Sequence, residues 1–383
     1  MEYTYPQYFY DFQCEASACS DTCCAGWGIS IDSVSLKKYK KYPGFFGNRL
    51  KNSINWENHS FEQYNGRCVF LNEENLCDIY TEGGPEMLCK ACTRYPRHYE
   101  EYENLREISL SLSCPAAARM IMSSDERMTF LKESRETPEE KYERFDSDLF
   151  TKLQEIRGYL YRVVQNRELS IEERMALIAA ASHDLQNRIG RRRFYPVEDL
   201  LKRYETPAFL KTARKKFAKY QGRKAERRTQ LQKMWRRLYR LEVLRPSWTE
   251  LLKEYEQKLY CGLSGEEYKE AVCAFAEYYK EKEYEYEQLL MYFLFTYVCG
   301  AVYDRDLFSK VRLAVVNTML IRELGIAVWL SKGRQLSFED QVEIAHRYAR
   351  EVEHSQPNIE AMEYMTAEEE LFTLEKLLNG ILG

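Results

Sequence analysis

The sequence predicts a mainly α-helical protein in which a small, irregular, cysteine-rich N-terminal domain precedes a multi-helix domain. Nine of the 12 cysteines lie between residues 14 and 114. From about residue 137 onward the chain consists of apolar runs with helical periodicity, several of which begin with a Ser/Thr-x-x-acid pattern typical of capped helices. These runs do not alternate with strand patterns, so a parallel sheet is not expected. We therefore divide the chain into domains of residues 1–125 and 126–383.

The composition is that of a soluble globular protein. The 383 residues suffice for two domains, with 45% apolar residues, 30% charged residues and a formal net charge of −4. The first ten residues have neither the basic nor the apolar region of a signal peptide. We expect no membrane span, because the apolar residues 289–302 are too few and residues 311–330 carry Arg312, Asn317, Arg322 and Glu323. A cytoplasmic protein is expected, in which thiols stay reduced.

Few regular elements are predicted at the start of the N-terminal domain. Residues 1–13 suggest a short strand or an extended segment. Residues 29–42 predict a short helix with Ser33 as its cap. Residues 43–67 are expected to be irregular, because glycines interrupt them.

The end of this domain has a clearer pattern. Residues 106–113 alternate apolar and polar side chains, which is typical of a strand. Cys114 follows and precedes Pro115, a favoured first residue of a helix. The Cys114 thiol should therefore lie at a helix N-terminus, a position that lowers a thiol pKa and favours the thiolate.

The cysteine spacing favours metal ligation. Cys23 and Cys24 are adjacent, two residues separate Cys89 from Cys92, and long loops lie between these pairs. Structural zinc and a [4Fe–4S] cluster both take four thiolates, so the spacing does not separate them. Disulfides are disfavoured in a reducing compartment, and inert buried cysteines are the other alternative. Residues 1–125 are therefore predicted to bind a metal or an iron–sulfur cluster.

The second domain is predicted to contain helices that begin at capping residues. A capping box at residues 137–140 predicts a helix of about 28 residues. Further starts are predicted at Ser170, Ser264, Ser337 and Thr366. Three cysteines fall in helical runs and are expected in the core, namely Cys261, Cys273 and Cys299.

One segment differs in charge from the rest of the chain. Residues 188–245 contain 20 Lys or Arg against 5 Asp or Glu, a local net charge of +15. We expect most of these charges to meet acidic side chains of the same protein, with docking to an acidic partner as the alternative. Nucleic-acid binding is not expected, because no zinc-finger, RRM or helix-turn-helix signature accompanies the charge.

Five motifs in the cysteine-rich region carry a family resemblance. They are CSDTCCAGWGISID at residues 19–32, GRCVFLNE at 66–73, LCDIY at 76–80, CTRYPR at 92–97 and SLSLSCP at 109–115. Their order and spacing resemble the flagellin lysine N-methylases over about residues 8–120. A wider set of small cysteine-rich proteins, described as zinc- or iron-chelating, shares several of these elements.

The resemblance implies methyl transfer from S-adenosylmethionine to lysine ε-amines of flagellin, with an iron–sulfur cluster, or alternatively zinc, bound by cysteines. The ligands carried over by position are Cys14, Cys19, Cys23, Cys24, Cys68, Cys77, Cys92 and Cys114. Arg94 and Arg97 are candidate clamps for the cofactor carboxylate, and Trp27 is a candidate cation–π partner for its sulfonium. Cys89 matches the family pattern least well and is left out.

The catalytic residues stay unassigned. The chain has no Gly-x-Gly-x-Gly loop after a strand, no SET-domain signature and no Cys-x3-Cys-x2-Cys motif of radical enzymes. Transfer to an amine needs a neutral lysine, so a nearby Asp, Glu or Tyr is expected to accept its proton. Two alternatives to the enzyme are a non-enzymatic zinc- or iron-binding module with a helical partner-docking domain, and a cluster-based redox protein.

Overall fold

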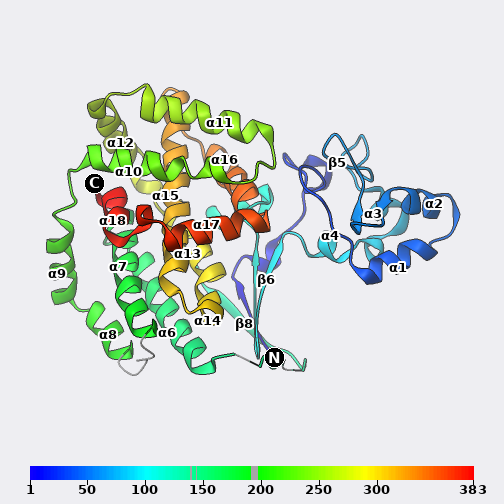
Figure 1. Ribbon diagram of the computed structural model, residues 1–383, viewed down its shortest axis with the longest axis horizontal. Helices are drawn as coiled ribbons and strands as arrows, with labels where there is room; N and C mark the ends of the chain where they lie inside the picture. The colour runs from blue at the N-terminus through cyan, green and yellow to red at the C-terminus, as the bar shows by residue number, and fades with distance from the viewer. Residues whose placement is uncertain (139, 144, 191–196) are drawn as a thin grey trace.

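The computed structural model describes residues 1–138, 140–143, 145–190 and 197–383. A large body of packed helices is joined, through a small sheet, to residues 14–94, which project from one side (Figure 1). We call residues 14–94 the cysteine lobe, and the helices from residue 147 onward the helical body. The prediction of a mainly helical protein is confirmed.

The sheet contains four strands that come from both ends of the N-terminal region. They are β1 Glu2–Pro6, β6 Arg97–Tyr102, β7 Leu105–Leu110 and β8 Phe130–Ser134. The strand order is β6-β7-β1-β8, with β1 parallel to β7 and antiparallel to β8. Every residue of β7 is buried, as expected for a central strand covered on both faces. The strands predicted within residues 1–13 and 106–113 are therefore present.

Helix α5, Pro115–Met122, follows β7 and begins at Cys114 as predicted. The predicted lowering of the Cys114 pKa is wrong. Burial raises the pKa of this thiol to about 11, and the backbone N–H groups of Ala117 and Ala116 offset that effect only in part. Desolvation of the thiolate outweighs the helix N-terminus at this position.

The cysteine lobe contains short helices and two-residue strands. They are α1 Ser33–Lys41, α2 Gly44–Asn52, β2 Ile54–Asn55, β3 Ser60–Phe61, β4 Gln63–Tyr64, β5 Arg67–Cys68, α3 Asp78–Gly83 and α4 Lys90–Arg94. Two predictions here are wrong. Residues 43–67 contain α2 and two small hairpins, and the cap of α1 is Asp32, which accepts hydrogen bonds from the N–H groups of Val34 and Ser35.

A separate hydrophobic core holds the lobe together. Ile29, Tyr39, Leu50, Phe70 and Ile79 are buried in it. This cluster is much smaller than that of the helical body, and partly buried cysteines pack against it. The lobe therefore has little apolar burial of its own with which to offset chain entropy.

The helical body contains thirteen α-helices among the described residues. They are α6 Ser147–Val164, α7 Ile171–Gly190, α8 Val197–Tyr204, α9 Pro207–Phe217, α10 Lys224–Trp235, α11 Pro246–Glu256, α12 Gly265–Tyr279, α13 Tyr284–Tyr297, α14 Ala301–Asp304, α15 Leu307–Ser331, α16 Phe338–Val352, α17 Gln356–Glu368 and α18 Leu374–Leu382.

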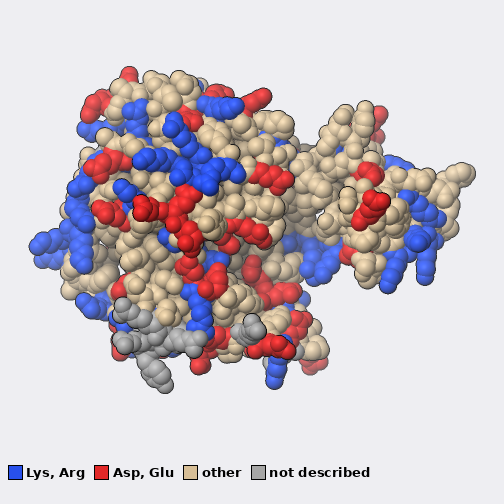
Figure 2. Space-filling view, viewed as in Figure 1, with Lys and Arg blue, Asp and Glu red and all other residues tan. Residues whose placement is uncertain are grey.

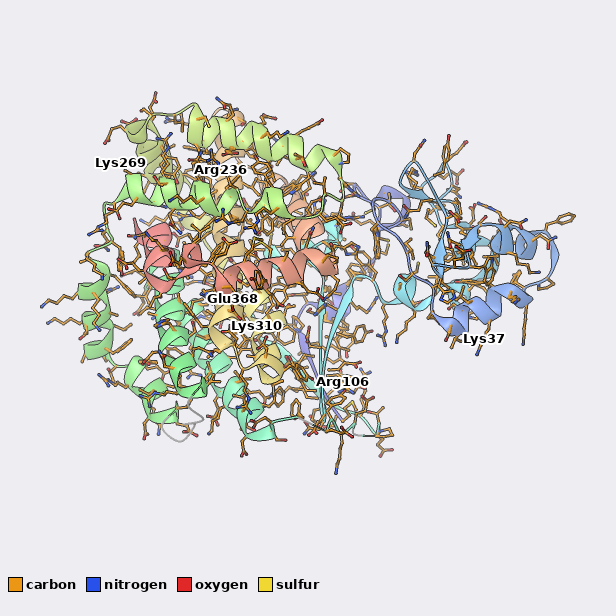
Figure 3. All side chains as sticks on the ribbon, viewed as in Figure 1. Lys37, Arg106, Arg236, Lys269, Lys310 and Glu368 are labelled. Atoms are coloured by element: carbon orange, nitrogen blue, oxygen red, sulfur yellow. The ribbon has the colours of Figure 1, made fainter. Side chains whose placement is uncertain are left out.

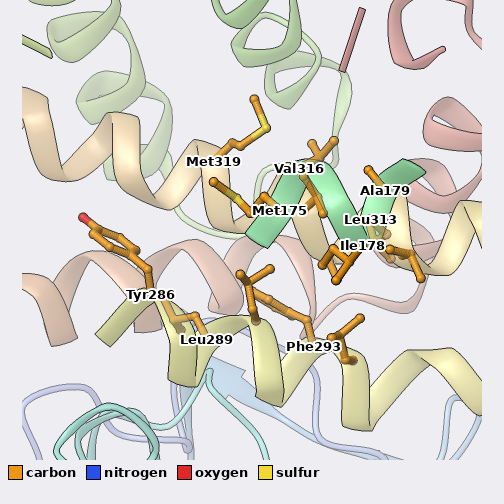
Figure 4. Close-up of a cluster of buried hydrophobic side chains, with 14 of the residues drawn as sticks. Met175, Ile178, Ala179, Tyr286, Leu289, Phe293, Leu313, Val316 and Met319 are labelled. Atoms are coloured by element: carbon orange, nitrogen blue, oxygen red, sulfur yellow. The ribbon is translucent and has the colours of Figure 1, made fainter. Parts of the chain in front are cut away.

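Helix α15 is the central element of the helical body. Leu313 and Val316 lie in a cluster with Ile178 of α7 and Leu289 and Phe293 of α13 (Figure 4). By length and composition α15 is the one described helix that could cross a membrane, but 94% of its apolar window is buried within the protein. A core helix surrounded by other helices accounts for this composition.

Helix starts were predicted with mixed success. The starts at Ser170, Ser264 and Ser337 are confirmed, because each hydroxyl accepts a hydrogen bond from the N–H three residues later. The start at residue 137 is wrong, since α6 begins at Ser147. Thr366 is buried inside α17 and donates to the Met362 carbonyl, so it caps nothing.

Two of the three cysteines predicted in the helical core are exposed. Cys299 is fully buried as expected, whereas Cys261 and Cys273 are exposed. Cys273 lies on α12 beside the buried Val272, on the face that the packed side chains leave to solvent. Helical periodicity, rather than residue type, decides burial at these positions.

Many charges of the basic segment are paired within the protein, as expected. Arg227 is buried and lies 2.7 Å from the Glu323 carboxylate, and Arg236, just after α10 (Figure 3), lies 2.7 Å from Glu256. Further partners are Glu173 for Arg214, Glu226 for Arg223, Glu369 for Arg237 and Arg240, and Asp21 for Arg245.

Candidate functional site

The cysteines of the first third of the chain fall into two neighbouring groups. Members of a group influence one another's ionisation through their charges. One group consists of Cys24, Cys68, Cys77, Cys89 and Cys92, and the other of Cys14, Cys19, Cys23 and Cys114. Cys23 and Cys24 share a hydrogen bond and so connect the groups. All predicted ligands are therefore brought into one region, together with Cys89.

One thiol of each close pair ionises easily. The S–H of Cys23 lowers the pKa of Cys24 to about 7, and the S–H of Cys92 lowers the pKa of Cys89 to about 7. Burial raises the pKa of Cys68 to about 12. A neutral thiol that donates to its neighbour stabilises the neighbouring thiolate, which is the form that binds metals.

In the described part of the chain, the side chains are not arranged as a metal site. Within the described ranges, no group of three or more His, Cys, Asp or Glu side chains is arranged to hold a metal ion. The twelve cysteines are all free thiols. The donor set still fits zinc or an iron–sulfur cluster, because its members are soft thiols gathered in two groups. The eight predicted ligands stay a prediction.

The loop that carries Cys19 to Cys24 is fixed to helix α16. The Arg350 guanidinium donates to the carbonyls of Asp21, Thr22 and Ala25, at 3.1, 2.7 and 3.0 Å. Burial alone would raise the pKa of Asp21, but hydrogen bonds from His346 and Arg245 and the Arg350 charge hold it well below its usual range. The loop therefore depends on residues more than 200 positions further along the chain.

Gly26 permits the close approach of this loop to the helical body. Its φ is +85°, in the region that favours glycine. A Cβ atom there would lie 2.8 Å from Nε of Arg245, which pairs with Asp21 at 2.6 Å. A larger residue would therefore disturb the contact between lobe and body.

Trp27 lies directly over the end of α16. Its indole N–H donates to the Cys23 carbonyl at 2.6 Å, and its ring centroid is 3.9 Å from that of His354. Tyr95 completes the group, with its ring 5.9 Å from Trp27. The ring is thus placed beside the cysteines, although a contact with a sulfonium stays a prediction.

Two ionisable groups follow α16 at this junction. Burial, with the charges of Arg350 and Arg245, lowers the pKa of His354 to about 4, so the imidazole is neutral, and its Nε2 has no hydrogen-bond partner among the described residues. Burial raises the pKa of Glu353 from 4.5 to about 7, although the Tyr297 hydroxyl donates to it. The second oxygen of Glu353 has no hydrogen-bond partner within the described part of the chain.

Glu353 and His354 were not predicted from the sequence. No motif marks them, and only their place after an amphipathic helix and the scarcity of histidine, with five in the chain, set them apart. The structure brings His354 to Trp27, more than 300 residues earlier, whereas the carboxyl of the neighbouring Glu353 accepts from Tyr297. This junction combines a neutral imidazole, aromatic rings and a carboxyl group that titrates near neutral pH, which suits proton transfer.

The two predicted carboxylate clamps lie against aromatic rings. The Arg94 guanidinium is 4.5 Å from the Tyr99 ring centroid, and that of Arg97 is 5.9 Å from Phe9 and 5.7 Å from Phe12. Neither has an ion-pair partner in the described part of the chain. Both are partly exposed, so their donors are available to an anionic group, and the clamp role stays a prediction.

Comparisons with known proteins point to one family. The family described as "FliB lysine N-methylase C-terminal domain" matches residues 157–380. The flagellar biosynthetic protein FliU of Salmonella muenchen is 31% identical over 134 residues, which cover 33% of this chain and 79% of FliU.

Two proteins named lysine-N-methylase, from Salmonella choleraesuis and Salmonella typhimurium, are also 31% identical over 134 residues. The match covers 33% of this chain and 33% of each relative, so the similarity spans a third of their length. No solved structure matches the chain significantly.

Proposed function

Because the chain belongs to the FliB lysine N-methylase family, we propose that it transfers a methyl group from S-adenosylmethionine to lysine ε-amines of flagellin in the cytoplasm. The names of the relatives support both the reaction and a flagellar substrate. The observation that carries the proposal is that Trp27, hydrogen-bonded to the Cys23 carbonyl, packs on the neutral His354, and that Glu353, the preceding residue, titrates near neutral pH.

The proposed reaction begins with removal of a proton from the lysine ammonium. An ordinary lysine has a pKa of about 10.4 and is charged at neutral pH. The ionised Glu353 takes this proton, and the neutral amine then attacks the methyl carbon. A C–N bond forms, the S–CH3 bond breaks with its electrons returning to sulfur, and S-adenosylhomocysteine leaves. The methylated amine keeps a positive charge until it loses a further proton to water.

The aromatic rings beside His354 serve the same step. Desolvation among rings lowers the pKa of an ammonium group, and ring faces attract a sulfonium. Trp27 and Tyr95 offer such faces beside His354. In this proposal, the two rings shield the lysine ammonium and the sulfonium from bulk water and keep them in the geometry that transfer requires.

The cysteines would hold an iron–sulfur cluster, or alternatively zinc, in the lobe. Four thiolates of the predicted set would ligate such a group, which supplies structural cross-linking when bound. The remaining thiols would pack around it and tune its surroundings. Methyl transfer to an amine needs no electron from this centre.

A pH profile of two matched variants tests the role of Glu353. Methylation of purified flagellin should rise with pH through about 7 as Glu353 ionises, and Glu353→Gln should lose this limb and slow turnover about a hundredfold. Glu351→Gln is the control, because Glu351 also titrates near 7 but accepts a hydrogen bond from the Leu244 N–H. Equal losses in both variants would contradict the assignment.

A non-enzymatic metal-binding module with a helical docking domain is the second candidate. The exposed basic surface of α9 favours it. It predicts that the protein with an intact metal site binds flagellin but does not methylate it. Mass spectrometry of flagellin after incubation with S-adenosylmethionine would then show no gain of methyl mass.

A further inference from the structure

A basic groove lies on the helical body, away from the cysteine lobe. It is formed by α7, α8, α9 and α18 and has a volume of about 810 Å³. Its floor is apolar, with Leu177, Leu200, Phe217 and Leu378 among the lining side chains. Figure 2 shows Lys and Arg gathered at this edge of the molecule, over α9.

Five cations surround this floor against a single carboxylate. The cations are Arg188, Arg203, Lys215, Lys216 and Lys219. The carboxylate is that of Asp184, which already accepts a hydrogen bond from the Tyr204 hydroxyl. The groove therefore has a net positive charge over an apolar surface.

The groove differs from the rest of the basic segment in its lack of internal partners. Seven arginines elsewhere in residues 188–245 pair with carboxylates of this chain. None of the five groove cations forms an ion pair with any described residue, and Nε of Arg188 is buried without a hydrogen-bond partner among them. The unpaired charges point to a partner from outside the chain.

We propose that this groove docks an amphipathic helix with an acidic polar face, carried by the protein substrate. The apolar face of such a helix would cover the aliphatic floor, and its carboxylates would meet the cations at the rim. Single-stranded nucleic acid fits less well, because it binds through exposed aromatic faces. None of the four rings that line the groove is exposed, since Tyr204, Phe217 and Tyr220 are buried and Phe209 is partly buried. The inference rests on the proposed function only in naming the substrate as the carrier.

The test uses two variants of the full chain with the same change in charge. The triple variant Lys215→Glu, Lys216→Glu, Lys219→Glu reverses the groove. The control Lys37→Glu, Lys40→Glu, Lys41→Glu reverses three exposed lysines of α1 in the cysteine lobe, where Lys37 is labelled in Figure 3. Circular dichroism establishes that both variants fold, and Lys→Gln at the same three groove positions gives a milder version.

The probe is a synthetic helical peptide with Leu on one face and Glu on the other, followed by fluorescence anisotropy. We expect the peptide to bind the unaltered protein with an affinity that falls as salt is added. The groove variant should bind it about tenfold more weakly, and the α1 control should bind it with unchanged affinity. A peptide with Lys in place of Glu should not bind. Peptide binding that survives charge reversal of the groove, or preferential binding of single-stranded RNA there, would overturn the proposal.

The same variants separate this inference from the proposed enzyme. With flagellin as substrate, the groove variant should raise KM while leaving kcat unchanged, because the groove is remote from Trp27 and Glu353. An unchanged KM for flagellin would overturn docking of the substrate. Absence of methylation by the unaltered protein, with peptide binding intact, would instead overturn the methyltransferase proposal and leave the groove standing.

Discussion

The cysteine lobe and the helical body are stabilised in different ways. The body has a large buried apolar core around α15 and contains buried ion pairs, such as that of Glu323 with Arg227. The lobe has a small core and a collection of free thiols. A small domain with little apolar burial usually needs metal ligation or a partner surface to stay folded. From this difference we expect that the lobe needs the proposed metal or cluster and its contact with α16 to stay folded, whereas the body stays folded without them.

Loss of the proposed metal or cluster should have the largest effect on this difference. Cys23→Ala, Cys92→Ala or Cys114→Ala should remove the metal and unfold the lobe while leaving the body folded, because ligation of a small domain contributes about 10 kcal/mol. Metal analysis and hydrogen exchange of lobe and body amides would measure this. The exposed Cys273→Ala is the control. Full metal content in all three variants would refute the ligand assignment.

Within the body, removal of a buried carboxylate should cause the largest loss of stability. Glu323 is fully buried and accepts hydrogen bonds from Arg227, Tyr260 and Tyr268 at 2.7, 2.7 and 2.9 Å. Glu323→Ala leaves Arg227 buried without its counter-charge and should cost about 3–5 kcal/mol. Denaturant unfolding measures the change. Glu266→Ala, at an exposed position of α12, should change stability very little.

A smaller effect is expected from pH at the junction of the two regions. Because the pKa of Glu353 is raised from 4.5 in the unfolded chain to about 7 in the folded protein, the folded state binds the additional proton between these values. Stability should therefore fall as pH rises from about 4.5 to about 7 and then level off. Glu353→Gln should remove this contribution. Unfolding at pH 5 and pH 8 would show whether the variant loses less stability than the parent.

The sequence predicted local features well where one residue type determines the conformation. Ser264 and Ser337 are helix caps as expected, since their hydroxyls bond within one turn. Thr366 has the same pattern but lies within a helix, because its surroundings are apolar and its hydroxyl bonds to the preceding turn. The short helix α2 in residues 43–67 was missed, because packing in the lobe overrides its glycines.

The sequence by itself determined the cysteine pattern, the helical periodicity and the resemblance that points to a methylase. Only the tertiary structure decided which groups meet. It placed His354 beside Trp27, and it divided the described part of one basic segment into arginines paired inside the protein and groove lysines that form no ion pair with a described residue. The reason is that burial and charge pairing depend on side chains far apart in sequence, which no local pattern brings together.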